Sequence, residues 1–161
     1  MTFAPYFWNE RDGEKLSTQV KTLAAKNKVD AGVITATLNS SLFYWWFTIL
    51  SDCRHLNTRE IDHFPLGASQ MDQQLKQELS YWCEELMHDY RHHTIRKECQ
   101  YKTTGRVSYD EFYPRHSKEI IDKIDCILAQ HYGFTDEELD FIINYIKYRM
   151  GQDGDNGDGE E

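Results

Sequence analysis

A short polar segment brings together five side chains that could contact DNA: Arg54, His55, Asn57, Thr58 and Arg59. An arginine guanidinium can donate two hydrogen bonds to guanine, and an asparagine amide can bind adenine in the same bidentate way. A threonine hydroxyl or a helix N-terminus can bind a phosphate. This combination of residue types predicts a surface that contacts double-stranded DNA.

Neighbouring acids give the same segment an alternative interpretation. Arg54 and Arg59 could form surface ion pairs with Asp52, Glu60 and Asp62, in which case the segment would contact no nucleic acid. Exposed ion pairs of this kind contribute little to stability and are common on protein surfaces. The residue types alone leave both interpretations open.

Other basic, hydroxyl and aromatic side chains belong to the DNA-binding hypothesis as weaker members. They lie on a candidate strand, in an aromatic segment and around a second turn: Thr18, Lys21, Tyr44, Arg96, Lys97, Lys102 and Arg106. The tyrosine is included because aromatic rings stack on bases in nucleic-acid sites.

An aromatic segment directly precedes the polar cluster and covers residues 43–47. Apolar residues recur around it at helical spacing, from Ile34 to Leu50. A helix that is apolar nearly all round belongs at the centre of a core, so we expect one buried helix from an N-cap at Asp30 to about Leu50. Core packing is then the expected role for most of these rings, and Tyr44 is the one expected to face outward.

Catalytic motifs are absent from the sequence. An enzyme that modifies a flipped base with a nucleotide-like cofactor would need a glycine-rich turn for the cofactor and an Asn/Asp-Pro-Pro-aromatic loop for the base. The chain has no GxGxxG pattern, and its three prolines, Pro5, Pro65 and Pro114, are isolated. We therefore expect no catalytic residue, no bound cofactor and no metal in this chain.

Histidines at helical spacing offer a metal-binding interpretation. Glu84, His88 and His92 are four residues apart, and two histidines at this spacing can chelate a metal. The alternative is that they lie on the solvated flank of a helix end, where histidine and Arg91 complement the helix dipole. We favour the second interpretation, because a histidine pair without a third well-placed ligand is common by chance.

Composition bounds the class of protein. The chain has 161 residues and a net charge of −9, and five of its acids lie in the Gly/Asp-rich segment 151–161. Residues 1–150 therefore keep a charge of −4, so DNA contact must come from a local patch. Four scattered cysteines without a CxxC pair, no membrane-length apolar run and no signal peptide indicate a cytoplasmic protein with reduced thiols.

Periodicity and capping signals predict a mainly helical domain over residues 1–150 and a disordered acidic tail over 151–161. Beyond the central helix, we expect a short helix from Asn57 or Thr58 to Asp62 and a long amphipathic helix from about Ser69 to Tyr90. A helix from Ser117 should end at Gly133. A capping box at residues 135–138 should open the last helix, with Leu139, Ile142, Ile143 and Ile146 facing the core.

A small β component completes the predicted α+β fold. Residues 2–8 indicate an edge strand or an ordered arm, paired as a hairpin with a strand over 17–25. Residues 94–101 have a weaker alternating pattern, and 102–106 form a turn. Residues 107–113 are aromatic and predicted to be irregular. The expected architecture is a single domain around a buried, aromatic-rich helix.

Three segments resemble those of a known protein family and occur in the same order along the chain. They are STQVKTL at 17–23, LNSSLFYWWFTILSDCRHLNTREIDHFP at 38–65, and HSKEIIDKIDCILAQHYGFTDEELDFIINYIKYRMG at 116–151. The chain resembles the C-terminal specificity region of bifunctional restriction–modification enzymes and related adenine-specific DNA methyltransferases. The last segment departs from the NYDIKYRMG of the family by lacking its Asp, which puts in doubt which of Lys147 and Arg149 face a partner.

The resemblance implies a DNA target-recognition module that is not catalytic on its own. Its partners would be double-stranded DNA and a methyltransferase catalytic domain or subunit, with S-adenosylmethionine bound only by that catalytic part. The chain would be a fragment, a truncated product or a separate specificity subunit. The alternative is a structural module in which the helices of residues 116–150 dock on the catalytic core without touching DNA.

Overall fold

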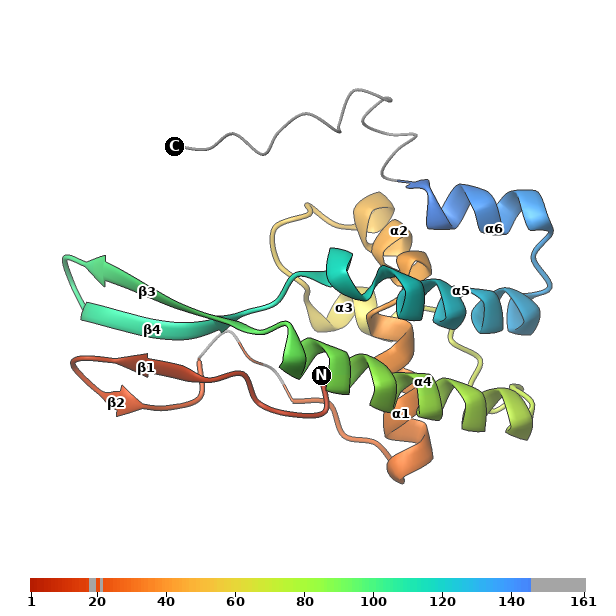
Figure 1. Cartoon of the computed structure of the whole chain (residues 1–161). Helices are drawn as coiled ribbons and strands as arrows, with labels where there is room; N and C mark the ends of the chain where they lie inside the picture. Colours follow the sequence, from red (N-terminus) through yellow and green to blue (C-terminus); the bar gives the residue numbers. More distant parts are fainter. Residues whose placement is uncertain (18–19, 21, 146–161) are drawn as a thin grey trace.

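A long amphipathic helix and a projecting antiparallel sheet dominate the molecule (Figure 1). The structure is a computed structural model that describes residues 1–17, 20 and 22–145. Within these residues six α-helices and a four-stranded sheet form one mixed unit, which confirms the predicted α+β class. The helices are α1 (Lys28–Leu38), α2 (Ser41–Leu50), α3 (Thr58–Asp62), α4 (Gln73–His92), α5 (Lys118–Tyr132) and α6 (Asp136–Ile143), with a short 3-10 turn η1 (Pro114–Ser117) before α5.

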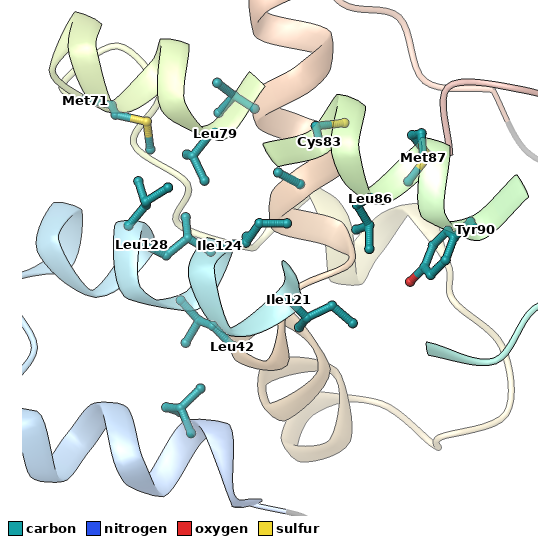
Figure 2. Close-up of a cluster of buried hydrophobic side chains, with 14 residues drawn as sticks. Leu42, Met71, Leu79, Cys83, Leu86, Met87, Tyr90, Ile121, Ile124 and Leu128 are labelled. Atoms are coloured by element: carbon teal, nitrogen blue, oxygen red, sulfur yellow. The ribbon is translucent and has the colours of Figure 1, made fainter. Parts of the chain in front are cut away.

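The core lies where α1, α4 and α5 pack together (Figure 2). The apolar stripe predicted for the long helix is its buried face, and Leu79 and Leu86 of α4 are fully inaccessible. Ile124 and Leu128 of α5 face them and are equally buried. Burying each such side chain contributes roughly 1.5–3 kcal/mol, so this three-helix contact stabilises the domain most.

The predicted central helix is wrong in its continuity. The chain forms two helices instead, α1 and α2, whose axes are bent by 61° at a break around Ser40. The N-cap of α1 is also one turn earlier than predicted, because Asn27 Oδ1 accepts a hydrogen bond from Asp30 N at 2.9 Å. Helical periodicity persists through the break, which is why it was not apparent from spacing.

Side chains of the LNSSL motif build this break. Ser40 Oγ donates to Thr37 O at 2.6 Å, closing α1, and accepts from Phe43 N at 3.0 Å, capping α2. The carboxylate of Asp125 on α5 accepts the next two amides, Ser41 N at 3.3 Å and Leu42 N at 3.2 Å. The free N–H groups of a helix start are thereby satisfied inside the protein.

The second correction concerns burial of the aromatic helix. In α2 only Leu42 and Phe43 are fully buried, whereas Ile49 and Leu50 at its C-terminal end are 54% and 47% exposed. The centre of the core is therefore α4, and α2 lies at its margin with one apolar end facing solvent. Tyr44 faces outward as expected, at 45% exposure.

Several predicted helix boundaries are confirmed. Asn57 is the N-cap of α3, and the capping box of Thr135 and Glu138 opens α6. Gly133 ends α5 with a φ of 70°, a left-handed conformation that favours glycine. Ser117 precedes α5 as predicted, but its hydroxyl donates to Asp89 Oδ2 at 2.5 Å instead of capping the helix. The predicted continuation of the last helix through Ile146 lies outside the described residues.

The sheet has the strand order β2-β1-β4-β3, with all neighbours antiparallel. Its strands are β1 (Phe7–Asn9), β2 (Gly13–Glu14), β3 (Ile95–Tyr101) and β4 (Gly105–Glu111). The predicted strand at 94–101 is confirmed. The irregular structure predicted for 107–113 is wrong over 107–111, where β4 pairs with β1 on one side and β3 on the other.

The N-terminal pairing also differs from the prediction. β1 is an internal strand, not an edge, and its hairpin partner is β2 rather than a strand over 17–25. The chain turns back early because Asn9 Oδ1 accepts from Asp12 N at 2.7 Å and Gly13 adopts a φ of 78°. In the predicted second strand, the residues that the structure describes (17, 20 and 22–25) form no strand.

Candidate nucleic-acid interface

The five residues of the predicted DNA-contacting cluster lie together on the α2–α3 loop and the start of α3. Every residue from Asp52 to Arg59 is exposed, whereas Glu60 directly after them is only 2% exposed. The loop thus presents Arg54, His55, Asn57, Thr58 and Arg59 on one continuous stretch of surface.

Local hydrogen bonds fix the conformation of this loop. Cys53 adopts a φ of 58° and is the only non-glycine residue with positive φ among the described residues. Its amide donates to Ser51 Oγ at 3.0 Å, and Arg54 N donates to Asp52 Oδ1 at 3.0 Å. The bond from Arg54 holds the pKa of Asp52 below its ordinary value. A left-handed non-glycine residue costs on the order of 1–3 kcal/mol, and such strain is concentrated at functional sites.

The far end of the loop is held by a buried carboxylate. Glu60 Oε2 accepts from Asn57 N at 3.0 Å, and Glu60 Oε1 accepts from Arg59 Nη2 at 2.9 Å. Trp46 Nε1 on α2 donates to Glu60 O at 3.3 Å, which ties α2 to α3 across the loop. The Arg59–Glu60 ion pair corresponds to part of the alternative interpretation, although the Arg59 side chain is still 69% exposed.

Apolar side chains surround the same loop. Ile49 and Leu50 end α2, and Leu56 within the loop is 40% exposed. Tyr44, earlier in α2, is also exposed. Exposed apolar groups gathered next to polar ones are typical of surfaces that bind another macromolecule.

The second group of predicted residues lies on the β3–β4 hairpin. Arg96 Nε donates to Asp110 Oδ1 at 2.6 Å, and its guanidinium lies 3.7 Å from the ring centroid of Tyr6. Lys97 Nζ lies 3.7 Å from a carboxylate oxygen of Glu111. Both positive charges are therefore compensated by carboxylates of the adjacent strand.

Lys102 and Arg106 have a different setting from the other two hairpin cations. Both are exposed and lie at the turn between β3 and β4, the end of the hairpin farthest from the helices (Figure 1). The Arg106 guanidinium lies 5.5 Å from the ring centroid of Trp8. The hairpin is part of the sheet, whereas the α2–α3 loop joins two helices. The other two predicted residues, Thr18 and Lys21, lie outside the described residues.

The histidine pair gains no third ligand. His88 Nε2 and His92 Nε2 are 3.2 Å apart, but Glu84 forms an ion pair with Lys28 at 2.6 Å. Among the described residues, no group of three or more His, Cys, Asp or Glu side chains is arranged to hold a metal ion. His88 and His92 are both exposed in the C-terminal part of α4, where the solvated-flank interpretation places them.

An open hollow of about 450 Å³ lies beside the hairpin and is mainly apolar, with Tyr6, Phe7, Tyr101 and Tyr109 among its lining residues. Its one charged side chain among the described residues is Asp110, which is already bonded to Arg96.

Asp125 has a raised pKa, as many catalytic carboxyls do, but its contacts are those of a structural residue. Burial raises its pKa to about 6 against the hydrogen bonds that it accepts. Its two oxygens are both occupied by amides at the start of α2, and the residue is 2% exposed. No substrate could reach it, so its role is to hold the break between α1 and α2.

Sequence reasoning missed this carboxylate and also Thr103 and Thr104, which lie at the tip of the β3–β4 hairpin. Asp125 gave no signal, because a single acid within an amphipathic helix is ordinary. The tip could have been recognised from Thr-Thr-Gly between two cations, a turn signal inside a basic segment.

Comparisons of the chain with protein-family models, curated proteins and solved structures gave no match. In the part of the chain that the structure describes, no helix taken singly has the length and apolar character to cross a membrane, and only the bent pair of α1 and α2 passes that test jointly.

Proposed function

We propose that the chain is the DNA target-recognition module of a restriction–modification adenine-specific DNA methyltransferase and has no catalytic activity of its own. The observation that carries the proposal is the α2–α3 loop. It is exposed from Asp52 to Arg59, fixed at both ends, and strained at Cys53. The resemblance of residues 38–65 to the specificity region of these enzymes supplies the class of partner.

The mechanism is positioning. Hydrogen bonds from its backbone amides to side-chain oxygens hold the loop in place. Such a loop loses little conformational entropy on binding, so its side chains can recognise base edges at small cost. Arg54 would contact guanine or phosphate, Asn57 adenine, and the N-terminus of α3 a phosphate. The partner catalytic domain, which would bind S-adenosylmethionine, would then flip the adenine.

The test is DNA binding by residues 1–161 over a salt series, with Arg54→Ala and Arg54→Ala/Arg59→Ala variants. The single variant is needed because Arg59 also neutralises the buried Glu60. Lys28→Ala/Lys123→Ala is a control for the double variant: it removes the same charge from exposed positions on α1 and α5. We expect binding to weaken with salt and to drop in the loop variants beyond the control.

The alternative function, a docking module without DNA contact, has its own supporting observations. Ile49, Leu50 and Leu56 are exposed beside the loop, and carboxylates compensate Arg59 and Arg96. Under this alternative, the helices of residues 116–150 dock on the methyltransferase core, and the exposed apolar side chains favour such a contact. Absence of DNA binding at low salt, with the fold intact by circular dichroism, would refute autonomous DNA recognition and favour docking.

A further inference from the structure

The β3–β4 hairpin projects away from the helices alongside the β1–β2 hairpin (Figure 1). Along β3 every residue is exposed except Cys99, which is half-buried. The strand is an outer edge of the sheet, so β4 is its one neighbour. β1 pairs with the other side of β4 from Val107 to Tyr109, so the hairpin is two strands wide only at its tip.

The tip of this ribbon has a defined shape. The last strand pair is Tyr101 with Gly105, so Lys102, Thr103 and Thr104 form the connection. Gly105 has a φ of 70°, and a Cβ there would lie 2.3 Å from Glu10 Oε2. Only glycine fits both the backbone conformation and this close approach.

The β1–β2 turn braces the tip from one side. Glu10 Oε2 accepts from Arg106 N at 2.8 Å, and Glu10 N donates to Arg106 O at 2.9 Å. These two bonds hold the start of β4 against the N-terminal hairpin. The tip is thus positioned by tertiary contacts as well as by its own turn.

The tip carries two cations, Lys102 and Arg106, and no acid within residues 101–106. Residues 95–106 carry four cations and one acid, Glu98, in a chain whose net charge is −9. The cations nearer the helices are compensated, since Arg96 pairs with Asp110 and Lys97 with Glu111. From Cys99 to Arg106 there are two cations and no acid, although Glu10 lies alongside.

We propose that the hairpin tip, residues 101–106, enters the major groove of duplex DNA as a β-ribbon. This inference rests on the proposed function and names a second contact element for it. Beyond the β1–β4 pairing the tip is two strands wide, and two strands about 4.8 Å apart fit a major groove about 12 Å wide. Lys102 and Arg106 bind phosphates or guanine, and the hydroxyls of Thr103 and Thr104 bind phosphates.

The deciding experiment compares Lys102→Ala/Arg106→Ala with the charge-matched Lys28→Ala/Lys123→Ala control in DNA binding by the full chain. The plot of log affinity against log salt concentration has a negative slope, and loss of two phosphate contacts makes this slope shallower by about 1.8. We expect that change in slope, with at least about a tenfold loss of affinity at low salt. Thr103→Ala/Thr104→Ala, which changes no charge, should weaken binding with a smaller change in slope.

Groove occupancy is tested by competition. Methyl green, a major-groove ligand, should displace the protein, and netropsin, a minor-groove ligand, should not. If the chain binds DNA and the tip variant behaves like the control, the ribbon contact is overturned while the proposed function stands. Displacement by netropsin alone overturns the major-groove placement. If the native chain binds no DNA at low salt, the proposed function fails first and the ribbon with it.

Discussion

Replacing Asp125 with asparagine tests how a buried carboxylate on α5 holds the start of α2. The native side chain accepts amide hydrogens from both Ser41 and Leu42 and is 2% exposed. Asparagine has the same shape but only one acceptor oxygen, and it carries no charge at any pH. Asp125→Asn therefore removes the titration while leaving most of the packing in place.

The expected magnitude follows from the pKa of Asp125, which burial raises from 3.8 to about 6. Because the folded protein binds this proton more tightly than the unfolded chain, the carboxyl favours folding most below pH 3.8. That contribution is lost as the pH rises through 6. Each unit is worth about 1.4 kcal/mol, so the full effect is about 3 kcal/mol and the change between pH 4 and 7 is about 2 kcal/mol.

The assay is urea unfolding of the native and Asp125→Asn proteins at pH 4, 5, 6 and 7, followed by tryptophan fluorescence. Other carboxyls, such as Asp52 with its lowered pKa, titrate in both proteins and cancel in the difference. Relative to the variant, the native protein should lose about 2 kcal/mol of unfolding free energy from pH 4 to 7. A flat difference, or one that rises with pH, would refute the argument that burial dominates at Asp125.

Three further predictions concern the α1–α2 break, the α1–α4 contact and the acidic segment. Ser40→Ala should lower the unfolding free energy by about 1–2 kcal/mol in urea, because it removes the cap of α2 and the bond to Thr37; an unchanged midpoint would contradict the capping role. Gly32→Ala places a Cβ 2.5 Å from Ser80 Oγ and should destabilise the α1–α4 contact by about 1–3 kcal/mol. A higher melting temperature in this variant would contradict that expectation. Deleting residues 151–161 changes the net charge from −9 to −4 and should strengthen DNA binding at low salt, whereas equal affinities would show that these acids are too far away to matter.

Much of the helical framework was predictable because its signals are local. The stripe that buries Leu79 and Leu86 has a clear helical period, and Asn57, Gly133 and Thr135 mark helix ends by chemistry confined to one turn. The exposed position of the polar cluster also followed from its charge density. These features need no knowledge of distant residues.

The candidate site was only partly predictable. The residue types at 54–59 indicated a DNA-contacting surface, but the left-handed Cys53 and the buried Glu60 that fix the loop were visible only in the structure. Likewise, the sequence marked four hairpin cations alike. The strand register separates them, because it places Asp110 and Glu111 beside Arg96 and Lys97, whereas the tip cations form no ion pair with the residues that the structure describes.

The sequence by itself determined the fold class, the amphipathic helices with their caps, and the location of charge along the chain, since each depends on contacts within a few residues. Only the tertiary structure decided that the chain bends at Ser40, that residues 105–111 form a strand, and that the end of α2 is exposed. A carboxylate 84 residues from Ser41 stabilises the bend, and pairing on both sides stabilises the strand. Such long-range partners leave no periodic trace in the segments that they stabilise.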